Sequence, residues 1–239
     1  MTASDFEVRE NGTVRPIELL PTTEPLRVAL IVSQIGRNHR LIPAARAFCE
    51  SFDGNGEVSV TAVMDEAEVL SGFSDRVGDC LAGLNRLEIK EILSSRTSPD
   101  LIDTILHASG TISREGWRSA IVVLRAGSER STPLYGERLR DPIRASGAVL
   151  YVASTPEAEK QLTASRGLAM STIVDSAIDS GGRHVLLGAD ATVMRPVAWE
   201  LAARYRIRYT VPTGMRSGSK LSVTSSRLGV TVLAPRITR

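Results

Sequence analysis

The stretch VALIVSQIGRNH, residues 28–39, decides the fold. It belongs to a near-continuous apolar run, residues 27–33, which is typical of a parallel strand covered on both faces. A turn containing Gly36 follows, and apolar residues at helical spacing then predict a helix over residues 42–52. A buried strand, a turn and a helix in this order are the repeating unit of an α/β fold. The turn lies where such folds bind their ligands.

The same alternation continues along the chain. Short apolar runs alternate with segments of helical period, so the sequence predicts an α/β fold with a doubly wound, mostly parallel sheet. The further expected strands are residues 58–64, 120–124, 148–153 and 184–187. The further expected helices are residues 76–87, 100–109, 139–146, 171–178 and 198–205.

Both ends of the chain have the two-residue period of strands. Asn11-Gly12, between alternating residues, predicts a two-residue hairpin turn, and Pro16 restricts the second strand to an edge or a bulge. The expected strands near the other end are residues 204–209, 221–224 and 230–233. We expect these ends to pair as a small β annex. The predicted parts are a hairpin and linker (1–24), the α/β domain (25–203) and a C-terminal β segment (204–239).

Composition excludes several classes of protein. No apolar segment approaches 18 residues, so we expect no membrane span, and the first ten residues have no apolar region typical of a signal peptide. Two cysteines form neither a disulfide framework nor a zinc site, and we expect Cys49 and Cys80 to be buried free thiols.

Charge is spread unevenly along the chain. Residues 195–239 hold nine lysines and arginines and the single acid Glu200, whereas acids outnumber bases before them. This asymmetry indicates either an anionic partner or a basic tail that packs on an acidic body. The arginines of residues 204–208 alternate with aromatic and apolar residues that face the other way. Protection of a strand edge is therefore favoured over nucleic-acid binding.

Other candidates for chemistry are weak. His39, His107 and His184 have no metal-ligand spacing, and no serine lies in a G-x-S-x-G turn. We expect His107 to lie at the surface or to cap a helix. Trp117 and Trp199 are interpreted as partly buried packing residues.

Three motifs appear in a fixed order. DFEVRENG at residues 5–12 precedes the α/β body, and GGR at residues 181–183 and YRIRY at residues 205–209 close it. With these motifs the chain resembles the von Willebrand factor A domain, and in particular the VWFA-related domains common in acidobacterial genomes. The resemblance covers nearly the whole chain and implies a Rossmann-like von Willebrand A fold. It also suggests a secreted or periplasmic protein.

The resemblance implies a divalent-metal site at the carboxyl end of the sheet, the metal-ion-dependent adhesion site. Its first loop reads Asp-x-Ser-x-Ser, its second supplies a Thr and its third an Asp. In this chain Ser33, Ile35 and Arg37 stand at the first-loop positions, Pro99 near the second and Ala126 at the third. Both carboxylates are absent, so we expect a degenerate site without metal or other cofactor.

We therefore expect a non-catalytic module that binds a protein partner. Polar residues in the same crevice are either solvated loop residues of a relic site or a binding surface, whose guanidinium groups could hold a carboxylate or phosphate without metal. The alternatives are a hydrolase-like enzyme that uses the crevice, or nucleic-acid binding through the basic end. The candidate partner-binding residues are Gln34, Arg37, Asn38, His39, Arg125, Ser128 and Arg130.

Overall fold

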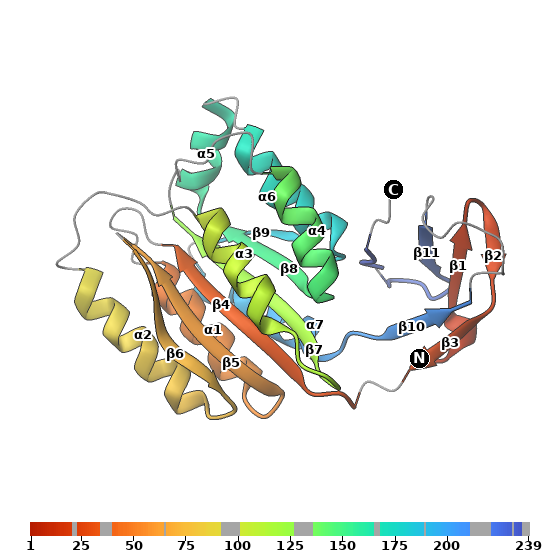
Figure 1. Ribbon diagram of the computed structural model, residues 1–239, viewed down its shortest axis with the longest axis horizontal. Helices are drawn as coiled ribbons and strands as arrows, with labels where there is room; N and C mark the ends of the chain where they lie inside the picture. The colour runs from red at the N-terminus through yellow and green to blue at the C-terminus, as the bar shows by residue number, and fades with distance from the viewer. Residues whose placement is uncertain are drawn as a thin grey trace.

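Figure 1 shows the computed structural model of the chain, which describes residues 1–20, 23–33, 40–64, 66–91, 101–126, 136–164, 168–188, 190–210, 221–230 and 232–235. One part is a central sheet with helices on both faces. The other part is the β annex, two small antiparallel sheets built from both ends of the chain. The predicted fold class is confirmed.

The central sheet has six strands in the order β6-β5-β4-β7-β8-β9. Its strands are β4 (Leu26–Ser33), β5 (Gly56–Val63), β6 (Ala67–Ser74), β7 (Arg118–Arg125), β8 (Val149–Ser154) and β9 (His184–Leu186). All neighbouring pairs are parallel except β5 with β6. Strand β4, which contains the apolar run of residues 27–33, lies near the centre of the sheet, so both of its faces are covered.

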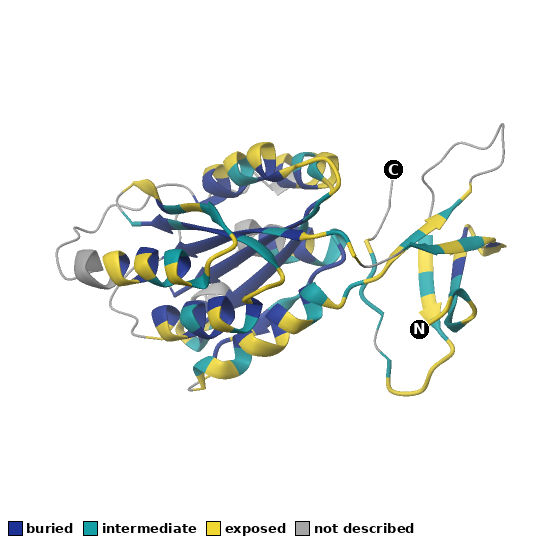
Figure 2. Cartoon of the chain, turned by 90° about the horizontal axis from the view of Figure 1, so that it is seen from below, coloured by how far each residue is buried: buried dark blue, intermediate teal, exposed yellow. Residues whose placement is uncertain are grey.

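Two hydrophobic layers enclose this sheet. Along β4, Val28 and Leu30 pack into the layer of α1, α2 and α7, whereas Ala29 and Ile31 pack into the layer of α3, α4 and α6. Strands β4, β7 and β8 are accordingly buried and the outer helix faces exposed (Figure 2). The helices of the body are α1 (Leu41–Phe52), α2 (Val77–Glu91), α3 (Leu101–Ile112), α4 (Gly136–Ser146), α5 (Pro156–Ala164), α6 (Leu168–Asp179), the short η3 (Ala191–Val193) and α7 (Met194–Ala202).

The last helix differs from its prediction. It was expected over residues 198–205, but α7 begins at Met194 and ends at Ala202. Its buried residues, which include Val197 and Leu201, follow the spacing of a helix face that packs on the sheet. Trp199 falls on the other face and is 59% exposed, so the expectation that it is a partly buried packing residue is wrong. Trp117 is half-buried, with the Arg114 guanidinium 4.5 Å from its ring centroid.

Two strand predictions also need correction. The antiparallel edge strand β6 was not expected, because only Leu70 of its eight residues is buried. Its pairing with β5 also shifts register. The strand expected at residues 230–233 is absent from the described residues 230 and 232–235. A side chain contacts this segment in place of a neighbouring strand: Arg204 donates a hydrogen bond to the carbonyl of Leu233 at 3.4 Å.

The annex pairs the two ends of the chain. Strand β1 (Phe6–Glu10) lies between β2 (Thr13–Arg15) and β11 (Leu221–Ser225), and β3 (Ile17–Leu20) pairs with β10 (Arg206–Tyr209). The predicted hairpin turn is confirmed, with positive φ angles of 50° at Asn11 and 79° at Gly12. Pro16 stands between β2 and β3, where the chain leaves one small sheet and enters the other. The 3-10 turn η1 (Ala3–Asp5) precedes β1.

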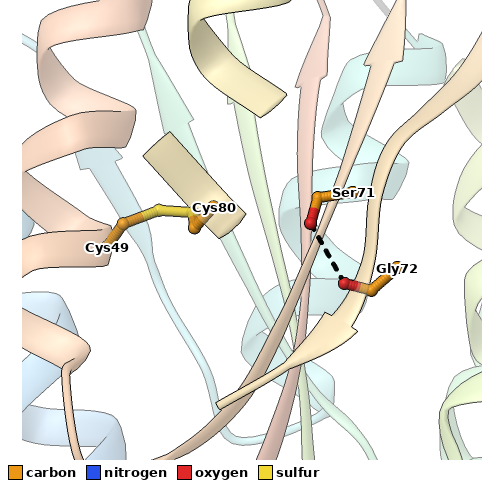
Figure 3. The surroundings of a disulfide bond; sticks show 4 residues. All are labelled: Cys49, Ser71, Gly72 and Cys80. Atoms are coloured by element: carbon orange, nitrogen blue, oxygen red, sulfur yellow. Dashed lines mark hydrogen bonds between the residues drawn. A yellow bond between two sulfur atoms is a disulfide. The ribbon is translucent and has the colours of Figure 1, made fainter. Parts of the chain in front are cut away.

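The two cysteines form a disulfide, which corrects the expectation of free thiols. Cys49 on α1 is bonded to Cys80 on α2, with 6.4 Å between their Cα atoms (Figure 3). Both residues lie on buried helix faces, and the two helices pack side by side in the same layer. The sequence shows only that each cysteine is on an apolar face. Their meeting depends on the packing of two helices whose cysteines are 31 residues apart.

A labelling experiment checks this cross-link. We expect a thiol-reactive maleimide to leave the denatured, unreduced protein unlabelled and to label both cysteines after reduction. A Cys49→Ser variant is the control, because it leaves one thiol that must react before reduction. Labelling of the unreduced wild-type protein would show that the pair is reduced.

Candidate functional site

A row of polar side chains lies at the carboxyl edge of the central sheet. Ser33 ends β4, Arg125 ends β7 and Ser154 ends β8, and the parallel register pairs Ser33 with Arg125 and Arg125 with Ser154. Directly paired residues point to the same face of a sheet, so these three side chains are neighbours. They are almost completely buried, with exposed fractions of 0%, 1% and 0%. We call Ser33, Arg125 and Ser154 the edge row.

The edge row contains one of the positions where the resemblance puts metal ligands, Ser33, and adjoins another, Ala126. Ser33 has a hydroxyl where the first-loop carboxylate is expected. Ala126 follows Arg125 at the third-loop position, is 5% exposed, and its carbonyl accepts a hydrogen bond from the Thr155 hydroxyl at 3.2 Å. The other three positions, Ile35, Arg37 and Pro99, lie outside the described residues.

Among the expected partner-binding residues, the structure describes Arg125 alone. Its side chain is 1% exposed, so its charge lies beneath the edge and almost none of its surface is available to a partner. Gln34, Arg37, Asn38, His39, Ser128 and Arg130 lie outside the described residues.

A histidine cluster that the sequence analysis did not predict adjoins the edge row. His184, the first residue of β9, has its Nε2 atom 3.0 Å from the Ser154 hydroxyl and 3.1 Å from Oε1 of Glu159 on α5. Burial lowers the pKa of His184 and Arg125 lowers it further, whereas the Glu159 carboxylate opposes them. The signal in the sequence was that residues 184–187 form the next parallel strand, which places His184 beside the end of β8.

The cluster has three residue types of a hydrolytic triad but not its geometry. A triad needs the serine on one ring nitrogen of the histidine and the carboxylate on the other. Here both partners contact Nε2, which carries at most one proton when the ring is neutral. Ser154 is also fully buried, so its hydroxyl is not positioned to meet a substrate. The arrangement fits a structural role, in which His184 links β8, β9 and α5.

The lowered pKa of His184 predicts a loss of stability in mild acid. Below the ordinary histidine pKa of 6.5 the unfolded chain takes up a proton that the folded chain binds less readily. This loss therefore begins near that pH, grows as pH falls and stops below the folded pKa. We expect melting temperature to fall more between about pH 8 and about pH 5 for wild type than for His184→Gln.

The exposed histidine of α3 provides the control for that measurement. His107 is exposed, as expected, so His107→Gln replaces a histidine in the same way without touching the contacts of His184. An identical pH dependence in wild type and His184→Gln would contradict the assignment.

Three of the described basic residues near the C-terminus form ion pairs with acidic residues from the start of the chain. Arg208 pairs with Glu18 at 3.2 Å across β10 and β3, Arg206 pairs with Glu24, and Arg227 pairs with Asp5 at 2.9 Å. These pairs agree with the second interpretation of the uneven charge, in which a basic tail packs on acidic residues.

Metal-binding clusters and membrane-spanning helices are both absent from the described part of the chain. No group of three or more histidine, cysteine or acidic side chains there is arranged to hold a metal ion. No described helix has the length and apolar character needed to cross a membrane.

Comparisons with known proteins identify the fold. No protein-family model matches the chain, and no curated protein matches it. Among solved structures, an aerotolerance-related membrane protein from Bacteroides fragilis, crystallised with multiple mutations to serine, is 14% identical over 74% of this chain and 98% of its own, with a TM-score of 0.55. The VWA domain of SpRpn10 is 16% identical over 72% of this chain and 94% of its own, with a TM-score of 0.52.

A third similar structure contains an occupied metal site. Proximal thread matrix protein 1 from the mussel byssus, described with a zinc-occupied MIDAS motif, is 13% identical over 81% of this chain and 49% of its own, with a TM-score of 0.56. Identities this low establish the fold and not the activity. The six-stranded sheet of this chain and its two helical layers therefore have the von Willebrand factor A fold.

Proposed function

We propose that the chain is a non-catalytic protein-interaction module that binds its partner at the carboxyl edge of the central sheet without a metal ion. The observation that carries the metal-free part of this proposal is the edge row. At the two positions where the resemblance puts carboxylates, the chain has Ser33, which belongs to the row, and Ala126, which directly follows Arg125. Hard divalent cations need several oxygen ligands, and anionic ones above all.

Electrostatics support a metal-free edge. The buried cation Arg125 lies in the middle of the row, and a divalent cation there would be repelled across a poorly hydrated region. Ala126 offers no side-chain oxygen. Glu159, a carboxylate near Ser154, already contacts His184. A metal would have to break that contact and overcome the charge of Arg125.

The proposed partner is anionic. Arg37 and Arg130 follow β4 and β7 in the sequence, and guanidinium groups bind carboxylate or phosphate bidentately. Gln34, Asn38, His39 and Ser128 would complete that surface. The Cys49–Cys80 disulfide supports an oxidising compartment such as the periplasm or the exterior, because disulfides persist there.

A metal titration tests the first half of the proposal. We expect Mg²⁺, Mn²⁺ and Ca²⁺ to leave the melting temperature unchanged up to about millimolar concentration, because a ligand that binds only the folded state must raise it. Ala126→Asp restores one carboxylate beside Arg125, and we expect that variant to remain unresponsive as well. Saturable stabilisation of the wild-type protein would overturn metal independence.

Charge reversal tests the second half. Partner capture in the presence of a chelator should succeed with the wild-type protein and fail with Arg37→Glu/Arg130→Glu. Arg76→Glu is a matched control, because Arg76 is 78% exposed and precedes α2 at the opposite edge of the sheet. Capture that requires divalent metal, or that survives the double reversal, would contradict the proposal. Turnover of an ester or peptide substrate would favour the hydrolase alternative.

A further inference from the structure

A cavity of about 800 Å³ lies between the annex and the body, far from the carboxyl edge of the sheet. One wall is the inner face of the annex, where Val8 of β1, Val223 of β11 and Ile207 of β10 contribute apolar side chains. Residues 229–230 and 232–235 form another wall. Its volume is in the range of pockets that enclose a drug-sized molecule or a short peptide.

The charged groups at the body side of this cavity are already engaged. Arg183 pairs with Glu200 at 2.9 Å, and Arg204 donates to the Tyr151 hydroxyl at 2.9 Å and to the Gly181 carbonyl at 2.8 Å. These charged residues could bind a charged ligand only if their existing contacts were broken. The cavity therefore favours an uncharged occupant that is bound by apolar contacts.

An unprotected strand edge adjoins the cavity. Among the strands that the structure describes, β11 pairs with β1 alone, so one of its edges has no partner strand there. Its sequence, Leu-Ser-Val-Thr-Ser, contains none of the charged residues or prolines that usually protect an edge. Strand β10 differs, because Arg206 and Arg208 alternate along it.

Alternate side chains of β11 face the cavity. Leu221 and Val223 are two residues apart, so they share one face of β11, and both line the cavity. Ser222 and Thr224 point to the other face. The segment after β11 does not follow it as a strand but reaches the body, where Pro235 lies against Gly181.

We propose that the annex binds an extended, uncharged segment of a partner protein, which pairs with the edge of β11 that no described strand covers and inserts alternate apolar side chains into the cavity. Addition of a strand to an open sheet edge obtains affinity from main-chain hydrogen bonds and specificity from pockets for alternate side chains. The edge and the pocket meet at β11. This surface is separate from the proposed anion-binding edge, so the two can fail independently.

Peptide display on the purified full chain tests this proposal. We expect enriched peptides to be uncharged, with apolar residues at alternate positions. Their affinity should fall at least about tenfold in Val223→Asp and in Leu221→Asp. The matched control is Val14→Asp, because Val14 is a 51% exposed valine on β2 outside the cavity lining. It should bind the peptides as wild type does.

Hydrogen exchange tests the same point without a substitution that could unfold the annex. A bound peptide should slow exchange of the β11 amides and leave those of the central strand β4 unchanged. Failure to enrich any peptide, equal binding to wild type and Val223→Asp, or protection elsewhere than on β11 would each overturn the proposal. Enrichment of charged peptides would do so as well.

Discussion

Gly182→Ala is expected to lower the free energy of unfolding by at least about 3 kcal/mol, the range of severe overpacking in a core. A Cβ atom on Gly182 would lie 1.9 Å from the carbonyl oxygen of Leu150 and 2.8 Å from its carbonyl carbon. Leu150 is a fully buried residue of β8, so its backbone can move only if the central sheet moves. Gly182 itself is fixed by a hydrogen bond from its amide to the carbonyl of Ala177 at 2.9 Å.

Urea unfolding of wild type and variant measures this effect. Gly110→Ala is the matched control, because Gly110 lies within α3 and a Cβ there would meet no atom within 4 Å. Alanine has the higher helix propensity, so the control should be neutral or up to about 1 kcal/mol more stable. A Gly182→Ala variant as stable as wild type would mean that β8 and the turn before β9 are farther apart than the structure places them.

The Gly-Gly-Arg motif thus has a physical explanation. Gly181 has a φ of +82°, which favours glycine, and a Cβ there would lie 2.8 Å from the nitrogen of Pro235. Gly182 lets the turn approach β8, and Arg183 pairs with Glu200 of α7. The sequence could mark this motif only by resemblance, since its reasons are contacts with residues distant along the chain.

Local patterns predicted most of the fold. The apolar run that became β4 and the Asn11-Gly12 turn carry their structural information within a few residues, so both were predicted correctly. Strand β6 was missed because an edge strand with one mostly exposed face lacks a clear apolar period. The exposure of Trp199 depended on which face of α7 meets the sheet.

Some features of the candidate site could likewise be predicted from the sequence, and others could not. Ser33 and Arg125 could be placed together from the sequence, because the ends of parallel strands share one edge. The contacts of His184 with Ser154 and Glu159 could not, because they join β9 to β8 and α5 across sequence separations of 25 to 30 residues. The burial of Arg125 could not be predicted from the sequence either, because it depends on all the residues that pack around the end of β7.

Arg118→Ala is the second large effect that we expect, with a loss of about 2–3 kcal/mol, the range for a hydrogen-bonding charged group. Arg118 begins β7, and its guanidinium donates hydrogen bonds to four backbone carbonyls. The acceptors are Glu24 at 3.0 Å and Leu201, Ala202 and Arg204 at 3.3 Å each. Burial lowers the pKa of this guanidinium, but an arginine remains charged in the folded protein.

These contacts place Arg118 where the body joins the annex. The carbonyls of Leu201 and Ala202 are at the end of α7 and have no partner within the helix, so a cation there satisfies them and the helix dipole together. Glu24 precedes β4, and Arg204 precedes β10. One side chain therefore holds both connections between the two parts. Its removal should loosen the annex as well as lower stability.

Three substitutions separate these effects. Arg118→Lys should recover only part of the loss, because an ammonium cannot reach four carbonyls with the planar fork of a guanidinium. Arg76→Ala should change stability by less than about 0.5 kcal/mol, because Arg76 is 78% exposed. In Arg118→Ala, hydrogen exchange should speed up in β3 and β10 before it does in β4. Equal stability of Arg118→Ala and wild type, or full recovery by lysine, would show that the four hydrogen bonds do not hold the end of α7.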